Sequence, residues 1–256
     1  MPLLALLAGV LPGWVPAEPL LDMVEVTSPP QSEAPPWTID LVPYYWAASL
    51  GGSLAIDGQT VDLEGGGDGF FGDPALSGFL GHFEAHRGPW SLVVAPIFIS
   101  ADMQGAQPPT TDADLTVQAE IHELFVAREF SDGWEWMLGL RYQKLETDMD
   151  LSVAGVPLSS HASERAWTDP IVGLRYHAHL SEDWTVHARA DVGGFGVGSD
   201  FVWNASVLTS YQCTRLFGLQ LGYRALSLDF EDLGAGGRLA YDLDLYGPIL
   251  GASFSF

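Results

Sequence analysis

The sequence predicts an all-β protein: a closed antiparallel up-and-down β-barrel that crosses a membrane with about ten strands. From residue 37 onward, apolar and polar residues alternate with a period of two, the pattern of strands with two different faces. Short polar turns alternate along the chain with longer connections rich in Asp, Gly, Ser and Pro. An aromatic residue closely follows each short turn. Such sorted loops and aromatic girdles are typical of membrane barrels.

Ten segments carry the strand pattern or have strand length: 38–50, 78–87, 90–103, 113–129, 134–152, 166–180, 184–198, 201–212, 216–230 and 239–256. Each is long enough to cross a bilayer with a tilt. An even number of strands brings both ends of the chain to the same side of the membrane. A barrel of eight strands with an extra hairpin is the alternative. In 239–256, Leu243 and Leu245 have the opposite parity to Phe254 and Phe256, which predicts a bulge near Gly247-Pro248.

Four short turns, at 87–89, 131–133, 181–183 and near 213–215, stand between these segments. The aromatic residues expected at the membrane interface are Trp90, Trp134, Trp184, Phe217 and Phe256. The longer connections are expected at 57–77, 104–112, 153–166 and 231–238.

Alternation also fits a secreted soluble β-barrel that binds a small ligand. The two differ in one apolar face, which a membrane barrel turns outward and a soluble barrel turns inward. Its residues are Trp136, Leu138, Leu140, Val172, Leu174, Val186, Leu219 and Leu221.

The N-terminal region is expected to be separate from the barrel. Residues 1–17 are apolar and end in V-P-A, which resembles a signal-peptide cleavage site. Residues 18–36 form a Pro-rich linker without periodicity, so the barrel is expected over 37–256. These features predict a location in the bacterial outer membrane.

Composition excludes several function classes. The formal net charge of −23 argues against binding nucleic acid. The lone Cys213 excludes an internal disulfide and a cysteine zinc cluster. The glycine-rich stretch 191–203 lacks the spacing of a nucleotide loop and continues into a strand. Its glycines are expected to form a tight turn and a bulge at positive φ.

The chain ends in L-G-A-S-F-S-F, with Ala252, Phe254 and Phe256 on one face. Together with V-P-Y-Y-W-A-A-S-L-G-G, D-V-G-G-F-G-V-G-S-D-F-V-W and L-G-Y-R-A-L, this ending resembles small bacterial outer-membrane β-barrels of the opacity-protein-like type. The resemblance implies that the assembly machinery of the outer membrane recognises Phe256. It implies no particular activity, because such barrels include adhesins, anchors, narrow pores and lipid-modifying enzymes.

If the polar faces point inward, the lumen holds a network of charged and polar side chains. Its predicted members are Glu84, Glu120, His122, Arg141, Asp169, Arg175, Arg189, Asp191 and Arg224. Buried charges must pair, so a largely plugged lumen with a structural or narrow-pore role is expected. The alternative is an outer-membrane lipid-modifying hydrolase, but the chain has no G-x-S-x-G. No catalytic residue, cofactor or metal site is predicted.

Acidic residues crowd the long connections, among them Asp62, Glu64, Asp112 and Asp232. A solvated surface explains them most simply. They could also bind lipopolysaccharide in the outer-membrane lipid through divalent cations, since hard cations prefer carboxylate oxygens. The barrel is expected to be a monomer.

Overall fold

The structure is a computed structural model that describes residues 35–56, 59–62, 76–107, 111–153, 156–232 and 239–256. The predicted signal peptide and nearly all of the predicted linker lie outside the described residues. The strands are β1 (Thr38–Ile56), β2 (Gln59–Asp62), β3 (Leu76–Arg87), β4 (Trp90–Gln107), β5 (Thr111–Ser131), β6 (Trp134–Val153), β7 (Val156–His179), β8 (Trp184–Gly194), β9 (Phe201–Gln212), β10 (Phe217–Asp232) and β11 (Leu239–Ser255). A membrane-spanning helix is not found in the described part of the chain.

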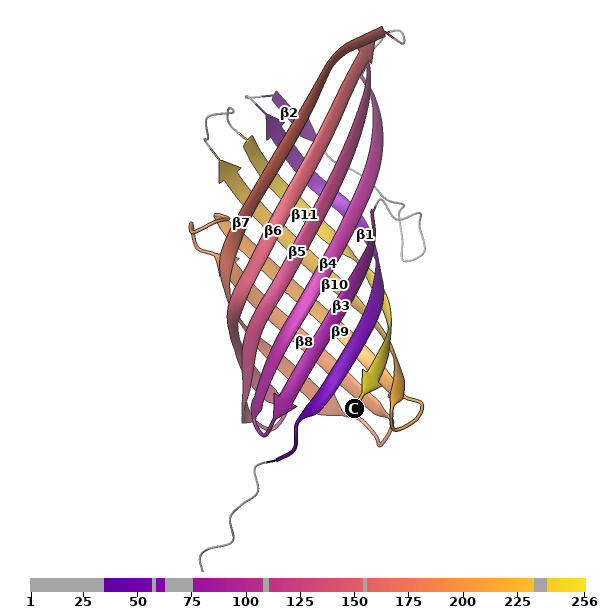
Figure 1. Cartoon of the computed structure of the whole chain (residues 1–256), viewed down its shortest axis with the longest axis vertical. Helices are drawn as coiled ribbons and strands as arrows, with labels where there is room; N and C mark the ends of the chain where they lie inside the picture. The colour runs from indigo at the N-terminus through magenta and orange to yellow at the C-terminus, as the bar shows by residue number, and fades with distance from the viewer. Residues whose placement is uncertain (1–34, 57–58, 63–75, 108–110, 154–155, 233–238) are drawn as a thin grey trace, which may run out of the picture. The chain divides into compact units, whose positions relative to one another are not determined.

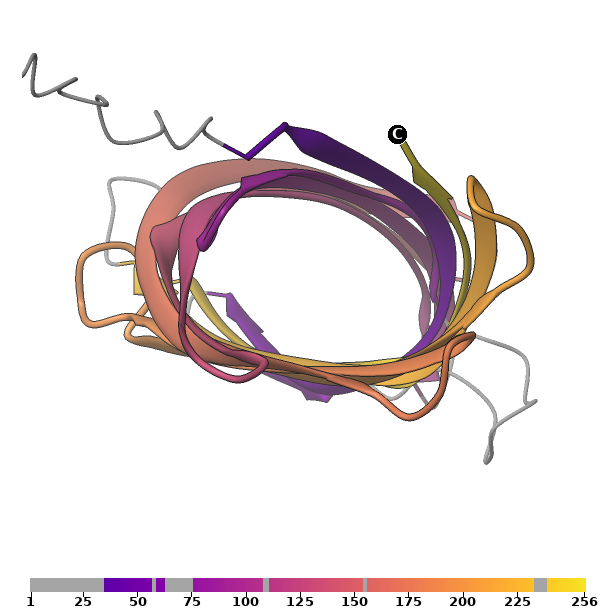
Figure 2. The same ribbon diagram turned by 90° about the horizontal axis from the view of Figure 1, so that it is seen from below.

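The strands form one closed antiparallel barrel. They pair in chain order, and β1 also pairs with β11 from Asp40↔Ser255 to Ile56↔Leu239, which closes the ring seen in Figure 2. The short β2 pairs only with the end of β1, so ten strands make up the wall. Closure leaves no sheet edge in the part of the wall that lipid surrounds, as a membrane requires. The prediction of a ten-stranded up-and-down barrel is confirmed.

The two ends of the barrel differ. At one end, here called the turn end, lie Thr38, Ser255 and the short turns between β3 and β4, β5 and β6, β7 and β8, and β9 and β10. At the other, the loop end, the strands reach very different heights. β5, β6 and β7 have 21, 20 and 24 residues, whereas β8 and β9 have 11 and 12, so β5–β7 rise well above the β8–β9 turn (Figure 1).

Two predicted long connections are wrong because these strands continue through them. β4 and β5 run to Gln107 and from Thr111, which replaces most of the loop predicted at 104–112. β7 begins at Val156, which replaces most of the loop predicted at 153–166. The outer side chains of this part of β7, such as Ser160 and Ala162, are small and exposed, so the apolar alternation that marks a lipid-facing strand is missing there.

The apolar face of the wall changes sides along the barrel. Toward the turn end, apolar side chains point outward; toward the loop end, they point inward. On β11, Leu243 and Leu245 face the interior while Phe254 lies on the outer face, and the register with both neighbours is uninterrupted. The bulge predicted near Gly247-Pro248 is therefore wrong. The change of parity marks the level at which the outer face passes from lipid to water.

An outward apolar belt surrounds the turn-end part. Leu138 and Leu221 are 58% and 53% exposed, and the rest of the apolar face predicted for a membrane barrel also points outward. Aromatic rings border the belt at both rims, with Trp134 and Tyr142 eight residues apart on β6. At ~3.3 Å per residue and a tilt of ~40°, this spacing corresponds to about 20 Å along the barrel axis, close to the height of an outer-membrane apolar band. The soluble-barrel alternative does not fit this belt.

The predicted interface aromatics lie at the turn end. Trp90, Trp134 and Trp184 are exposed at the beginnings of their strands. They extend into ring pairs across the strands: Trp90 with Trp136, Trp134 with Tyr176, Trp184 with Tyr211, and Phe217 with Phe254. Phe256, the last residue, is 69% exposed.

Candidate functional site

The centre of the lumen is occupied by the carboxylate of Glu123 on β5. It accepts hydrogen bonds from Arg141 on β6 at 2.8 and 2.9 Å and from Arg189 on β8 at 2.7 Å. Arg224 on β10 donates to it at 3.2 Å. Four strands separate β5 from β10 in the ring, so the contact of Glu123 with Arg224 spans the lumen.

A second carboxylate closes this central cluster. Asp191 on β8 accepts from Arg141 at 2.7 Å and from Arg189 at 2.8 Å. Asn204 on β9 donates to Asp191 at 2.8 Å and accepts from Arg224 at 2.7 Å. The side chains of Arg141, Glu123 and Asp191 are completely buried. Each of these charges therefore depends on its neighbours in the cluster, because burial removes water as an alternative partner.

A second cluster lies nearer the turn end. Arg175 on β7 donates to both oxygens of Glu84 on β3 at 2.9 and 3.0 Å, which is again a contact across the lumen. It also pairs with Glu135 at 3.2 Å. The ring of Phe125 joins the two clusters, since the guanidinium groups of Arg175 and Arg189 lie 5.7 and 4.7 Å from its centroid.

Toward the loop end, Asp169 holds the β8–β9 turn against the inside of the wall. The carboxylate of Asp169 accepts from the backbone N–H of Ser199 at 2.6 Å and from its hydroxyl at 2.7 Å. Gln143 donates to Asp169 at 2.6 Å, and Trp167 donates to the Ser199 hydroxyl at 2.8 Å. Ser199 is thus fully buried at the tip of a hairpin.

The glycine-rich stretch makes this turn possible. Gly194 and Gly196 have φ of +87° and +72°, which confirms the tight turn at positive φ expected from the sequence. Gly198 has a different role. A Cβ at Gly198 would lie 2.6 Å from Oδ1 of Asp169 and 2.8 Å from the ring of Trp167. The missing side chain lets the turn approach close enough for Ser199 to reach Asp169.

Replacing Gly198 with alanine is expected to destabilise the barrel by about 1–3 kcal/mol, because the added methyl group pushes Ser199 away from a buried carboxylate. Gly196→Ala is the matched control: its Cβ meets nothing within 4 Å, so only the positive φ is penalised, at about 1 kcal/mol. Unfolding midpoints in urea measure both. A smaller loss for Gly198→Ala than for Gly196→Ala would contradict this account of the turn.

Apolar side chains fill the interior beyond the central cluster, toward the loop end. Trp46 lies between the two regions: Arg224 packs on its ring at 5.4 Å, and its Nε1 donates to the carbonyl of Gly247. Trp167 on β7 stacks on Phe230 on β10, with 4.1 Å between ring centroids, above the shorter β8 and β9. The buried members of this apolar layer are Trp46, Ala48, Leu50, Leu80, Ile97, Ile99, Ile121, Leu145, Val202, Leu226, Leu228, Phe230, Tyr241 and Ile249.

The structure places most of the predicted lumen residues inside the barrel. Those in the central cluster are Arg141, Arg189, Asp191 and Arg224. Those in the second cluster are Glu84 and Arg175. Asp169 is buried but contacts Gln143 and Ser199 and not an arginine.

The prediction is wrong for Glu120 and His122. Their side chains lie on the outer face, 47% and 37% exposed, and pair with each other at 3.5 Å. The physical reason is that β5 leaves the lipid near His122, so polar side chains beyond it can face outward into water. Three cluster residues were not predicted from the sequence: Glu123, Glu135 and Asn204. For Glu123, the signal lies in Leu124 and Val126, which share the outward parity of His122.

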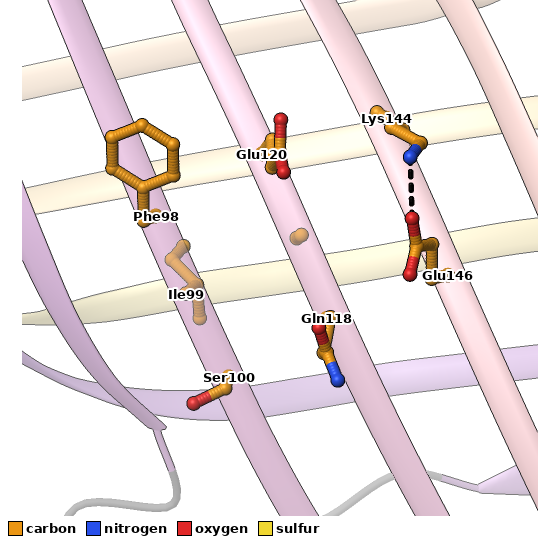
Figure 3. Close-up of a pocket in the computed structure, with 8 residues that line it drawn as sticks. Phe98, Ile99, Ser100, Gln118, Glu120, Lys144 and Glu146 are labelled. Carbon is orange, nitrogen blue, oxygen red and sulfur yellow. Dashed lines mark hydrogen bonds and ion pairs between the residues drawn. The ribbon is translucent and has the colours of Figure 1, made fainter.

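A pocket of about 320 Å³ lies on this outer face, across β4, β5 and β6 (Figure 3). Lys144, the single lysine of the chain, lies beside it and pairs with Glu146 and with Glu164. The pocket adjoins the loop-end rim of the belt, where the ring of His122 lies 5.4 Å from Phe98 and 6.0 Å from Tyr142. Its lining residues are Phe98, Ile99, Ser100, Gln118, Ala119, Glu120, Lys144 and Glu146.

A hydrogen-bonded Ser–His pair, which the hydrolase alternative requires, is not found among the side chains that the structure describes. The histidines with defined side-chain bonding partners pair with Glu84, Asp40, Glu120 or Thr185, and none of these partners is a serine. Among the described residues, no group of three or more His, Cys, Asp or Glu side chains is arranged to hold a metal ion.

Solved structures of outer-membrane proteins are similar to this chain to different degrees. The outer-membrane protease OmpT from Escherichia coli is similar in structure, with a TM-score of 0.53 and 11% identity over 86% of this chain and 97% of OmpT. The attachment invasion locus protein Ail of Yersinia pestis gives a TM-score of 0.38 at 12% identity, covering 87% of this chain and 99% of Ail. Neisserial surface protein A gives 0.28 at 12% identity, covering 86% of this chain and 97% of that protein.

The closed ten-stranded wall, the outward apolar belt and the fold shared with OmpT define an outer-membrane β-barrel. No family model matches the chain, and no curated protein matches it in sequence.

Proposed function

We propose that this protein is a non-conducting, non-catalytic outer-membrane barrel of the opacity-protein-like type that anchors a rigid β-sheet extension at the cell surface. The turn end faces the periplasm and the loop end faces the cell exterior. In such barrels the short turns lie on the periplasmic side and the longer connections lie on the extracellular side. The observation that carries the proposal is the set of ion pairs crossing the lumen, Glu123 with Arg224 and Glu84 with Arg175.

Barrel size supports a closed lumen. In a wall of eight to ten strands, side chains nearly fill the interior. Here the charged clusters occupy the part of the lumen within the belt, and the apolar layer occupies the part beyond it. An ion entering from the loop end would have to pass this mainly apolar layer, where few polar groups could replace its water, which is costly.

The purified wild-type protein in planar lipid bilayers is expected to show no stable conductance steps. Insertion is verified on the same sample by the shift in gel mobility between unheated and heated protein. The matched variant is Arg189→Ala combined with Arg224→Ala, which removes two of the three arginines that hold Glu123. This variant is expected to conduct. Stable steps in the wild-type protein would contradict the proposal and favour a narrow pore.

The outer face suggests the lipid partner of the barrel. Glu120, Glu146 and Glu164 lie just beyond the loop-end rim of the belt, at the level expected for lipid headgroups. Carboxylates at this level can bind the phosphates of lipopolysaccharide through divalent cations. At the opposite end, the exposed Phe256 is available to the assembly machinery during insertion. We propose both partners together with a monomeric barrel.

A further inference from the structure

Strand β7 has a long open edge at the loop end. It pairs with β6 along nearly its whole length, from Val153↔Val156 to Trp134↔Tyr176. Its pairing with β8 begins only at Ile171↔Gly193, because β8 ends at Gly194. Among the described residues, the part of β7 before Ile171 therefore has a strand on one side only. Figure 1 shows this part of β7 rising free above the β8–β9 turn.

The hydrogen bonds of β7 show which groups point to the open side. His177 donates its N–H to Gly133 on the β6 side, whereas Leu180 donates to Trp184 on the β8 side. In an antiparallel ladder these directions alternate with residue number. The register with β6 stays constant from Ser159 to Tyr176, so the backbone groups of Ser160, Ala162, Glu164 and Ala166 point to the open side.

One contact shows that a group on the open side binds a side chain of β7 itself. The guanidinium of Arg165 donates to the carbonyl of Glu164 at 2.9 Å, so a side chain occupies an acceptor that a neighbouring strand would otherwise use. The side chains of Ser160, Ala162 and Ala166 are small and exposed. Soluble proteins usually protect such an edge with proline or with several charges. Here Pro157 and Pro170 flank the segment, and none lies between them.

The surroundings favour a basic partner. The β8–β9 turn below the open edge ends in Asp200, whose N–H donates to the carbonyl of Asp229. Asp229 lies directly opposite Asp242 on β11. Like charges in this position repel each other. Asp229 also interacts unfavourably with Asp200, so the three aspartates form a negatively charged group that attracts cationic side chains.

We propose that the open edge of β7 binds an extended basic polypeptide segment by β-strand addition. In the seven residues from Ser160 to Ala166, four residues direct their backbone N–H and C=O groups to the open side, which is enough to pair with one short strand. Backbone hydrogen bonds supply the affinity, and the aspartates select basic side chains. This inference rests on the proposed function only in that the extension stands outside the membrane.

The probe is a fluorescein-labelled octapeptide of alternating lysine and valine, titrated against the full-length protein in lipid nanodiscs by fluorescence anisotropy. Ala162→Pro removes an N–H from the open edge and leaves the ladder with β6 intact. It is expected to weaken binding about tenfold. Ala162→Ser keeps the N–H and is expected to bind like the wild-type protein. Arg165→Gln frees the Glu164 carbonyl and is expected to bind several-fold more tightly.

Three results would overturn the inference. One is the absence of saturable binding by the wild-type protein. Another is equal binding of the same peptide methylated on alternate backbone nitrogens, which would mean adsorption by charge alone. The last is a change of oligomeric state in Ala162→Pro, measured by sedimentation without peptide, which would mean that a second copy occupies the edge. The bilayer conductance is measured separately, so failure of the proposed function remains distinguishable from failure of this inference.

Discussion

Glu123→Ala is expected to destabilise the barrel by about 3–5 kcal/mol, because it leaves three arginines around an empty space in the lumen. Arg141, Arg189 and Arg224 all donate to Glu123. Asp191 still accepts from Arg141 and Arg189, but Arg224 keeps only its hydrogen bond to Asn204. A buried guanidinium without a counter-charge is among the most costly groups in a folded protein.

The free energy of unfolding is measured by urea titration of the protein refolded into lipid vesicles, followed by tryptophan fluorescence. Glu120→Ala is the matched control: it lies on the same strand, on the outer face, in an exposed pair with His122. Its expected cost is at most about 1 kcal/mol. Equal losses in the two variants would mean that Glu123 is not the centre of the network.

The sequence alone predicts the class of fold because two strong physical signals coincide within the belt. Lipid outside and paired charges inside produce clean alternation in segments such as 134–142 and 184–192. The inward placement of Arg141, Arg189 and Asp191 follows from that alternation together with the rule that an outward charge cannot face lipid.

The same signal fails where the wall leaves the membrane. Beyond the belt the outer face meets water and the interior becomes apolar. Apolar residues of a strand therefore point outward within the belt and inward beyond it, although the strand continues. Glu120 and His122 are predicted inward because the alternation in 115–122 places them on a polar face, although Leu124 and Val126 further along β5 share their parity. The first part of β7 was predicted as a loop because Ser, Ala and Glu on its outer face carry no apolar alternation. The height at which a strand leaves lipid depends on all ten strands together, so it cannot be predicted from the sequence of one strand.

Leu138→Arg tests the apolar belt on the outer face, as Glu123→Ala tests the charged cluster in the lumen. Leu138 lies midway between Trp134 and Tyr142 on β6, which places it near the bilayer midplane. A basic residue on the lipid face at that depth is expected to cost about 2–4 kcal/mol of barrel stability. The reason is that a guanidinium there loses water and gains no partner, unlike Arg141 three residues later on the lumen face.

Glu146→Arg is the matched control, since it has the same parity on the same strand but lies beyond the rim of the belt, beside Lys144. It is expected to cost at most about 1 kcal/mol, since its charge stays in water. Comparing the two variants by urea unfolding in vesicles locates the lipid boundary between positions 138 and 146. If both variants lost the same small amount of stability, position 138 would not face lipid, and the belt would have to be the surface of a barrel in water. A large loss confined to Leu138→Arg would mean that the parity reversal along β5 and β11 coincides with the edge of the bilayer.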